Sequence, residues 1–530
     1  MSFPWSHGMR AALLASVVSL VLTGSGRAAD VTEDQAKELS GQLRGWMAGI
    51  VTDRLPLSPG LFTVRPAGAN YSLTMPLPPG VLGMPDDTGN PTDAAIVALV
   101  HPESGTRWRI ESLKFPSAFR LSPSSAAALG ALGAIASPPG GMAIAPPPLA
   151  PRLAPVPPNT VPSAEWHTRT QTASGVFDTA QLSDSRLDFR IEGVTYDTAN
   201  VGGSTASHTS VDRYSGTTTL HPTAAGGLDL GGDATIEGYK QVGSTPTFGS
   251  IRVAARRMAV RGEMGSVMTG QVATLIRTAV TYGLDAAAAQ SGGDKAATAN
   301  PNADRDTART IIATLKGILD GVRLEEIVEG LDVEVAQGRG SADTVRFAFA
   351  GNAPDSKFQG FMEMGLGGVK VLGLPPQFAD LVPRSFVFRP TVGNIDVKAL
   401  TALAEDATQG DADPEMLKAR LMGLFVSSGV RLGIEHLDID LGFASMTASG
   451  TATMLNQHAG RGQADIVVTN LDALMVRAQT LPNGGQAIGV MAMAKGFGKA
   501  QGNKTVWHIA FSEDNKVLVN GMDVSRMGGK

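Results

Sequence analysis

The chain of 530 residues carries a formal net charge of -5, contains no cysteine and is 43% hydrophobic, a composition typical of globular proteins. The absence of cysteine excludes disulfide bonds, thiolate metal sites, a lipid-modified cysteine and cysteine nucleophiles. The acidic net charge does not favour nucleic acid as a partner. The densest basic stretch, IRVAARRMAVR at 251–261, has no aromatic residue to stack on a base. A strand protected by surface charge is therefore favoured there over a phosphate-binding patch.

The first residues have the pattern of a secretory signal peptide. Arg10 precedes the uncharged apolar run AALLASVVSLVLT at 11–23, and Gly26 and Ala28 are the small residues that cleavage after Ala28 requires. A helix of this run rises only about 20 Å, which is short for a membrane span, and an uncleaved N-terminal anchor is the alternative. We therefore expect residues 1–28 to be removed, and the mature chain to contain no transmembrane segment. Export without disulfides suits the periplasm.

Residues 29–121 are expected to form an N-terminal helix followed by antiparallel strands. The stretch TEDQAKELSGQLRGWMAGIV at 32–51 begins with a capping-box pattern, Thr32 with Gln35, and its apolar residues recur at helical spacing. Strand character follows at 61–78. A pair of strands is predicted within 94–115, with the turn at 102–105.

The segment 122–164 differs from the rest of the chain in composition. It includes SPPGGMAIAPPPLAPRLAPVPPNTVP, which is rich in Ala and Pro and carries one charge. Such a composition predicts an extended linker or a disordered insertion. A linker between two domains and an insertion within one larger domain are both compatible with it.

Residues 165–530 are predicted to be rich in β-structure. The motif D-x-x-I-E-G occurs at 188–193 and at 233–238, and the intervals rich in Gly, Ser and Thr are typical of an antiparallel meander. Helical segments are expected around 267–288 and 304–319.

An internal repeat relates 313–335, ATLKGILDGVRLEEIVEGLDVEV, to 419–441, ARLMGLFVSSGVRLGIEHLDIDL. Each copy predicts a helix that leads into a strand, and further strands are predicted at 343–351, 360–373, 445–455 and 463–471. A duplicated unit explains this order of matches, and chance similarity is the alternative. The predicted fold class is therefore α+β and β-rich, with repeated helix-plus-antiparallel-meander units that form extended curved sheets.

Two acidic pairs are the candidates for chemistry. Asp332 with Glu334, and Asp438 with Asp440, each place two carboxylates on one strand face, about 7 Å apart. This spacing suits the acid and base of a glycosidase-type hydrolase. Alternating acidic and aliphatic residues are also typical of a half-exposed strand, and we favour that solvated face.

Other catalytic and metal-binding patterns do not occur in the sequence. The histidines are scattered without H-E-x-x-H, there is no calcium-loop pattern, and GGSTA at 202–206 lacks the G-x-S-x-G spacing. KGFGKAQG at 495–502 suits the C-terminal cap of a helix better than a phosphate-binding loop. We therefore predict no catalytic residue, no cofactor and no metal site, and favour a protein that is not an enzyme.

The C-terminal region carries a family resemblance. The segments ADIVVTNLDALMVRAQ at 464–479, MAMAKGFGKA at 491–500 and KTVWHIAFSEDNKVLVNGMDVS at 504–525 resemble the end of a family of uncharacterised alphaproteobacterial envelope proteins, the domain-of-unknown-function 2125 family. They are more distantly similar to the periplasmic 945-type relatives, which also end in a V-N-G segment. The resemblance covers roughly the last hundred residues. It implies an exported, β-rich protein without assigned catalytic residues.

Two functions from different classes remain at this stage. The first is a non-enzymatic periplasmic protein that binds or scaffolds in the cell envelope, with a lipid or another apolar ligand, or an envelope protein, as its partner. It rests on predicted curved sheets and on apolar segments such as GFMEMGLGGVKVLGLP at 360–375. The second is an envelope hydrolase that uses one of the acidic pairs. The hairpin predicted at 506–521 is expected to close the last sheet.

Overall fold

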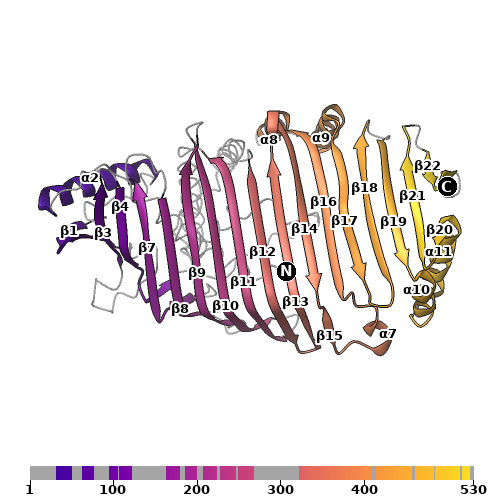
Figure 1. Ribbon diagram of the computed structural model, residues 1–530, viewed down its shortest axis with the longest axis horizontal. Coiled ribbons are helices and arrows are strands. Elements are labelled where there is room, and N and C mark those ends of the chain that lie inside the picture. Colours follow the sequence, from indigo (N-terminus) through magenta and orange to yellow (C-terminus); the bar gives the residue numbers. More distant parts are fainter. Residues whose placement is uncertain are drawn as a thin grey trace, which may run out of the picture. The chain divides into compact units, whose positions relative to one another are not determined.

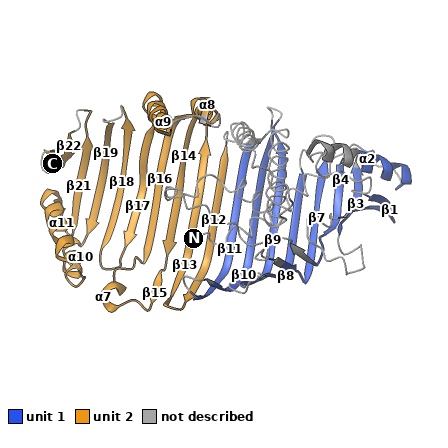
Figure 2. Cartoon of the chain, turned by 180° about the vertical axis from the view of Figure 1, so that it is seen from behind, with its two compact units in different colours: residues 1–318 blue, residues 319–530 orange. Residues whose placement is uncertain are grey.

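The structure is a computed structural model, and it describes residues 31–50, 63–76, 95–104, 107–121, 163–178, 185–199, 207–223, 227–245, 249–267, 321–407, 414–455, 460–482, 484–513 and 516–525. The chain divides into two compact units, Met1–Ile318 and Leu319–Lys530 (Figure 2). In each unit the strands pair antiparallel, which confirms the β-rich architecture. The predicted signal peptide, nearly all of the Ala/Pro-rich segment, and the predicted helices at 267–288 and 304–319 lie outside the described residues.

The elements of unit 1 are one helix and a series of antiparallel strands (Figure 1). In chain order they are α2 (Glu33–Ile50), β1 (Thr63–Ala67), β2 (Asn70–Pro76), β3 (Ala95–Ser104), β4 (Arg107–Lys114), β5 (Ala118–Leu121), β6 (Ser163–His167), β7 (Thr170–Asp178), β8 (Ser185–Ala199), β9 (Ser207–Pro222), β10 (Leu228–Thr245) and β11 (Gly249–Val267).

Helix α2 confirms the helix predicted from the capping box. The backbone N–H of Gln35 donates to Thr32 Oγ1 at 3.3 Å. In a capping box the Gln35 side chain would bond directly to the backbone N–H of Thr32. Here the hydroxyl of Tyr71 in β2 lies between them: it accepts from the N–H of Thr32 at 3.1 Å and donates to Gln35 Oε1 at 2.5 Å. Ala36 and Leu39 are buried at helical spacing. Tyr71 therefore joins the start of the helix to the sheet.

The core of unit 1 lies on one face of β2, β3, β4 and β7. Trp108 lies between two aromatic neighbours, with ring centroids 5.7 Å from Tyr71 and 6.5 Å from Phe177. Tyr71 and Leu73 of β2, and Ala98 and Val100 of β3, alternate with less buried residues, as period-2 burial requires. The buried apolar residues of these strands are Tyr71, Leu73, Ala95, Ile96, Ala98, Val100, Trp108, Ile110, Leu113, Ala173 and Phe177.

The strands of unit 1 form a meander. Strands β1, β2, β3 and β4 pair in that order. Strand β4 then pairs with β7, β5 pairs with β6, and both β6 and β7 pair with β8. Strands β9, β10 and β11 follow β8 in order. The strands on the two sides of the segment 122–164 therefore pair with one another, and residues 163 and 164 already belong to β6. The division between the two compact units falls instead between Ile318 and Leu319.

The elements of unit 2 are strands with helices between them (Figure 1). They are β12 (Val322–Val335), β13 (Gly338–Asn352), the 3-10 turn η2 (Pro354–Ser356), β14 (Lys357–Gly367), β15 (Lys370–Leu372), α7 (Pro376–Ala379), β16 (Ser385–Asp396), α8 (Val397–Ala407), α9 (Pro414–Ser428), β17 (Arg431–Asp440), β18 (Ser445–Met454), β19 (Gly460–Thr469), α10 (Leu471–Ala478), α11 (Gly484–Phe497), β20 (Lys499–Gln501), β21 (Lys504–Phe511), β22 (Val517–Val519) and β23 (Met522–Asp523).

The sheet of unit 2 has the neighbour order β12, β13, β14, β16, β17, β18, β19, β21, β22 and β23. The short strands β15 and β20 pair with β13 and β21. The strands predicted from 343 to 471 and the C-terminal hairpin are confirmed. The internal repeat stays a prediction: both of its strands are present as β12 and β17, and α9 precedes β17, but the helix expected before β12 lies outside the described residues.

Strands β8 and β10 of unit 1 each contain a glycine in the left-handed region of φ, and both glycines lie opposite the same residue of β9, the strand between them. The register places Asp212 of β9 opposite Gly193 of β8 and Gly238 of β10, whose φ angles are 60° and 64°. A Cβ on Gly238 would lie 1.9 Å from Asp212 Oδ2. Both glycines close the two D-x-x-I-E-G motifs. The motif therefore marks a position that favours glycine because of its φ angle, and an added Cβ would in addition clash with Asp212 at Gly238 and with Arg169 at Gly193.

The same arrangement occurs in unit 2. Asp343 of β13 lies opposite Gly330 of β12 and beside Gly368, which follows β14, and the two glycines have φ angles of 62° and 64°. A Cβ on Gly368 would lie 2.0 Å from Asp343 Oδ2. One aspartate flanked by two left-handed glycines is thus a feature that both units share.

Left-handed asparagines connect strands to helices in unit 2. Asn394, near the end of β16, has φ 66° and donates from Nδ2 to the carbonyls of Ser428 and Gly429 at the end of α9, at 2.5 and 3.2 Å. Asn520, after β22, has φ 51° and donates to the carbonyl of Phe497 at the end of α11 at 2.7 Å. Each side chain satisfies carbonyls that the end of a helix leaves without an intrahelical partner.

Replacing Asn520 with glycine is expected to lower the free energy of unfolding of unit 2 by about 2 kcal/mol. Besides its bond to Phe497, Asn520 donates to the Val506 carbonyl at 3.1 Å and accepts from the N–H of His508 at 3.0 Å. Glycine tolerates the left-handed φ, so only the side-chain hydrogen bonds are lost. Urea unfolding followed by hydrogen exchange of peptides from α11 and β21 measures the change.

The matched control is Asn503, whose exposed side chain makes one 3.3 Å hydrogen bond to Asn470. Its replacement by alanine is expected to change the same quantity by no more than about 0.5 kcal/mol. Equal losses in the two variants would mean that the V-N-G asparagine does not hold α11 to the sheet.

Candidate functional site

The four predicted acidic residues lie on two strands that are not neighbours. Asp332 and Glu334 are on β12, Asp438 and Asp440 are on β17, and β13, β14 and β16 lie between the two strands. At about 4.8 Å per strand, the two pairs are at least about 19 Å apart. The structure therefore does not bring the pairs together into one site.

The contacts of these carboxylates are those of a strand face and a turn. Asp332 accepts a bidentate ion pair from Arg339 of β13, with Nε–Oδ1 at 3.0 Å and Nη2–Oδ2 at 2.6 Å. Asp440 Oδ1 accepts from the backbone N–H of Gly442 at 2.7 Å in the turn after β17. Among the described residues, no group of three or more histidine and acidic side chains is placed to hold a metal ion.

One face of the unit 2 sheet carries a row of ion pairs that crosses five strands. The N–O distances along this ion-pair row are 2.9, 3.0, 3.5 and 3.1 Å, and its members are Glu325 of β12, Arg346 of β13, Glu363 of β14, Arg389 of β16 and Glu435 of β17. Glu363 is only 8% exposed and contacts both arginines. Two guanidinium groups therefore pair with one buried carboxyl group.

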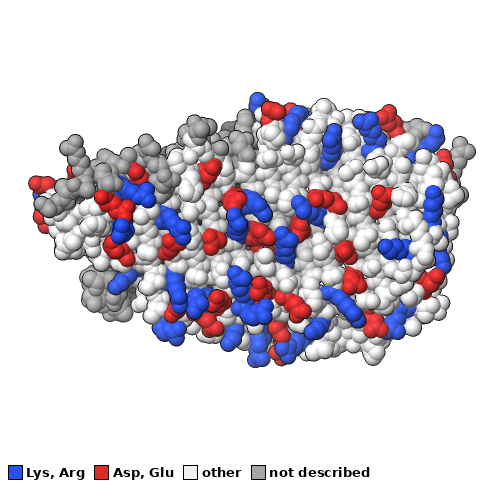
Figure 3. All heavy atoms as spheres, viewed as in Figure 1, with Lys and Arg blue, Asp and Glu red and all other residues white. Residues whose placement is uncertain are grey.

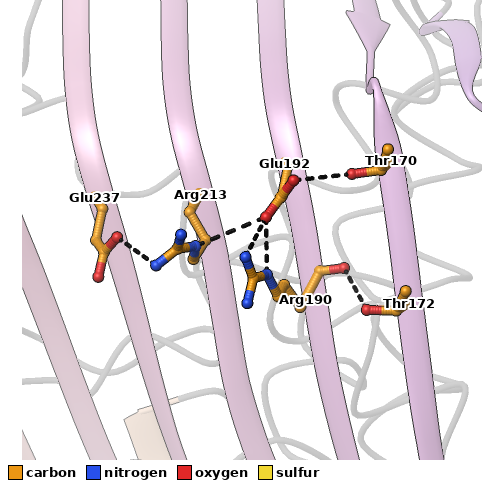
Figure 4. A network of polar contacts seen from close by, with 6 residues as sticks. All are labelled: Thr170, Thr172, Arg190, Glu192, Arg213 and Glu237. Carbon is orange, nitrogen blue, oxygen red and sulfur yellow. Dashed lines mark hydrogen bonds and ion pairs between the residues drawn. The ribbon is translucent and has the colours of Figure 1, made fainter.

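Unit 1 has a row of the same kind (Figure 4). Arg213 of β9 contacts Glu237 of β10 at 2.9 Å and Glu192 of β8 at 3.9 Å, and Glu192 also accepts from Arg190 and from Thr170 Oγ1. The hydrogen bond from Arg190 lowers the pKa of Glu192. In the space-filling view, acidic and basic side chains lie next to one another over the strands (Figure 3). Rows of opposite charges across strands are favourable cross-strand pairs.

The residues that alternate with the ion-pair row of unit 2 are almost all apolar. On β14, Met362, Met364 and Leu366 alternate with Glu363, so they lie on the opposite side of the sheet. Residues on this side pair directly with one another across the six strands β12, β13, β14, β16, β17 and β18, and they form two rows that we call the apolar face. The first row is Val328, Val345, Leu366, Phe386, Ile439 and Met446, and the second row is Glu326, Phe347, Met364, Phe388, Leu437 and Ala448.

Helices α10 and α11 cover one end of the apolar face. The rows continue through pairs of Met446 with Val468 and of Ile466 with Trp507. There Val468 and Trp507 form a buried cluster with Leu471, against which other residues of α10 and α11 pack. The indole Nε1 of Trp507 donates to the carbonyl of Ala494 of α11 at 2.7 Å. This end of the face is therefore an ordinary packed core.

In the middle of the sheet the apolar face is open to solvent. Met364 and Leu366 of β14 are 37% and 39% exposed, whereas Glu363 between them, on the charged side, is 8% exposed. Apolar side chains normally lie on the buried side of a sheet and carboxylates on the wet side. At β14 the apolar side of the sheet is therefore more exposed than the charged side, the reverse of the usual arrangement.

One ionisable residue belongs to the apolar face. Glu326 lies between Leu324 and Val328 along the same side of β12 and directly opposite Phe347 of β13. Burial raises the pKa of Glu326 from its usual 4.5 to about 7, because the charged form is poorly solvated there. When protonated, this carboxyl offers a hydrogen-bond donor and an acceptor within an otherwise apolar surface.

Sequence reasoning singled out the segment 360–375, and the structure places its Met364 and Leu366 on the apolar face. It missed Glu326. The signal was available, because Glu325 and Glu326 are adjacent in a predicted strand and adjacent residues of a strand lie on opposite sides. One of two adjacent glutamates must therefore lie on the apolar side.

No family model matches the chain, and the comparisons with curated proteins and with solved structures found no similar protein. No described helix is both long and apolar enough to cross a membrane.

Proposed function

We propose that this protein is a non-enzymatic binding protein of the bacterial cell envelope, which holds an apolar ligand such as a lipid acyl chain against the apolar face of unit 2. The observation that carries the proposal is the inverted exposure at β14, where Met364 and Leu366 are exposed and Glu363 is buried. The N-terminal signal pattern and the resemblance to the 2125 family support an exported, periplasmic protein.

The dimensions of the apolar face suit an extended chain molecule. Its two rows cross six strands, and five spacings of about 4.8 Å give about 24 Å. The hydrocarbon core of a bilayer is about 30 Å thick and holds two layers of chains, so one acyl chain extends about 15 Å. One chain therefore fits along a row, with Met, Phe and Leu side chains as contacts. Methionine suits such a surface because its unbranched side chain adapts to ligands of different shape.

The test is native mass spectrometry of the mature chain purified from a periplasmic extract, with solvent extraction of bound molecules. We expect a stoichiometric apolar ligand on the wild-type protein. Replacing Met364 with glutamate places a charge in the middle of the apolar face, and is expected to reduce the bound ligand by roughly tenfold. Met364 is exposed enough that the variant should still fold.

The matched control replaces Thr447 with glutamate, because Thr447 of β18 is exposed and lies between Met446 and Ala448, on the other side of the sheet. This variant should carry as much ligand as the wild type. A bare protein mass for the wild type, or equal ligand on both variants, would contradict binding at the apolar face.

A further inference from the structure

We propose that the helix pair α10–α11, with the strand hairpin that follows it, is a contact site for an anionic lipid membrane surface. This inference concerns a surface other than the apolar face and does not depend on the ligand proposed above. It rests on two properties of the segment 471–504, which are its exposed apolar side chains and its local charge.

The outer side of this helix pair is apolar and exposed. Val490 and Met493 of α11 are 63% and 66% exposed, and Val476 of α10 is 63% exposed. On the inner side, Met491 and Phe497 pack against the buried cluster on the sheet. Helix α11 has one charged residue, Lys495, in 14 residues. A helix that is apolar on all sides is usually covered on all sides, and the described residues cover only the inner one.

The charge of the same segment is opposite to that of the chain. Residues 471–504 contain Arg477, Lys495, Lys499 and Lys504 and a single acidic residue, Asp472, whereas the whole chain has a net charge of -5. Arg477 is paired with Asp380, which follows α7. Asp472 pairs with Lys495 at 2.5 Å. Lys499 and Lys504, at the start of β20 and of β21, are exposed and form no ion pair within the described part of the chain. Exposed apolar residues and unpaired lysines within one segment match a membrane surface with anionic headgroups.

The charge also argues against a second copy as the occupant. In a two-fold symmetric dimer the same patch meets itself, so the unpaired lysines of one copy would face those of the other. Like charges across an interface disfavour association. An anionic bilayer neutralises the lysines and accepts the apolar side chains at the same time. Because α10 and α11 also cover the end of the apolar face, this contact would place the proposed ligand-binding surface beside a lipid source.

The test is flotation of the full mature chain with two kinds of vesicle, one of phosphatidylcholine alone and one containing about 30% phosphatidylglycerol, an anionic content at which basic segments bind. We expect binding to the anionic vesicles that weakens as salt is raised. The double variant Val490→Asp, Met493→Asp is expected to bind at least roughly tenfold less. The variant Lys499→Glu, Lys504→Glu should lose a similar factor on anionic vesicles only. Met416→Asp on α9, where Met416 is 58% exposed, is the control that keeps wild-type binding.

Three results would overturn the proposal. One is no binding to anionic vesicles by the wild-type chain. Another is binding that neither double variant reduces. The third is a wild-type dimer in analytical ultracentrifugation that Val490→Asp, Met493→Asp converts to a monomer, which would assign the patch to a second copy. Ligand content by native mass spectrometry is measured on the same samples. Loss of vesicle binding with retained ligand separates this proposal from the proposed function.

Discussion

Replacing Gly368 with alanine is expected to lower the free energy of unfolding of unit 2 by about 3 kcal/mol. Two effects add. An alanine at φ 64° adopts the left-handed region at a cost of about 1–2 kcal/mol. Its Cβ would also lie 2.0 Å from Asp343 Oδ2, so the carboxylate or the backbone must move. Hydrogen exchange of peptides from β13 and β14 during urea unfolding reports the change in this unit.

The control separates the two effects. Gly502 has φ 63°, and a Cβ added there would meet no atom within 4 Å, so alanine at this position is expected to cost only the left-handed term, about 1 kcal/mol. A double-mutant cycle gives a second check, because Asp343→Gly removes both the carboxylate and the Cβ that would lie 2.0 and 2.7 Å from the new methyl group, and should reduce the cost of Gly368→Ala to the same value. Equal costs at Gly368 and Gly502 in the wild-type background would disprove the close approach.

Replacing Glu326 with glutamine is expected to stabilise unit 2 at pH 8 by up to about 3 kcal/mol and to have little effect near pH 4.5. The pKa of Glu326 is raised from 4.5 to about 7 in the folded protein. Below pH 4.5 the carboxyl is protonated in both states, so its contribution to stability is fully present. Between pH 4.5 and 7 the carboxyl group ionises in the unfolded state but stays protonated in the folded state, which favours unfolding. The contribution of Glu326 to stability is therefore lost by the time the pH passes 7. Glutamine cannot ionise, so the decrease between pH 4.5 and 7 should disappear.

The neighbouring glutamate is the control for this pH profile. Glu325 lies on the other side of β12 and pairs with Arg346 at 2.9 Å, so Glu325→Gln should destabilise the protein at pH 8. Urea midpoints from pH 4.5 to 8, followed by exchange of β12 peptides, measure both variants. A Glu326→Gln variant that is no more stable than the wild type at pH 8 would show that this carboxyl is well solvated.

The strands and the first helix could be predicted because their signals are local. The capping box at Thr32 and the alternation in β13, β14, β18 and β19 each depend on residues close in sequence. The third partner of the capping box, Tyr71, could not be predicted, since its hydroxyl reaches Thr32 and Gln35 only after β2 packs beside the helix.

The candidate site was less accessible to sequence reasoning. Alternation predicts that Met364 and Glu363 lie on opposite sides of β14, but it also predicts that the apolar side is buried, and here it is the more exposed one. Which side is covered depends on the other segments that pack on the sheet. The ion-pair row on the charged side could not be predicted either, because Arg346, Glu363 and Arg389 come together only through the register of three strands. The acidic pairs were visible in sequence because each lies within one strand.

The ion-pair rows have a consequence for how such long meanders keep their alignment. A slip of one residue between two strands would turn arginines and glutamates toward the apolar side, where no opposite charge meets them. Misaligned hairpins are therefore penalised at every strand that takes part in a row. A new hairpin would pair with the edge strand in the correct register if it carried one acidic and one basic residue at the positions that continue the ion-pair row. Sheets of this kind can be lengthened one hairpin at a time without changes to the strands already in place.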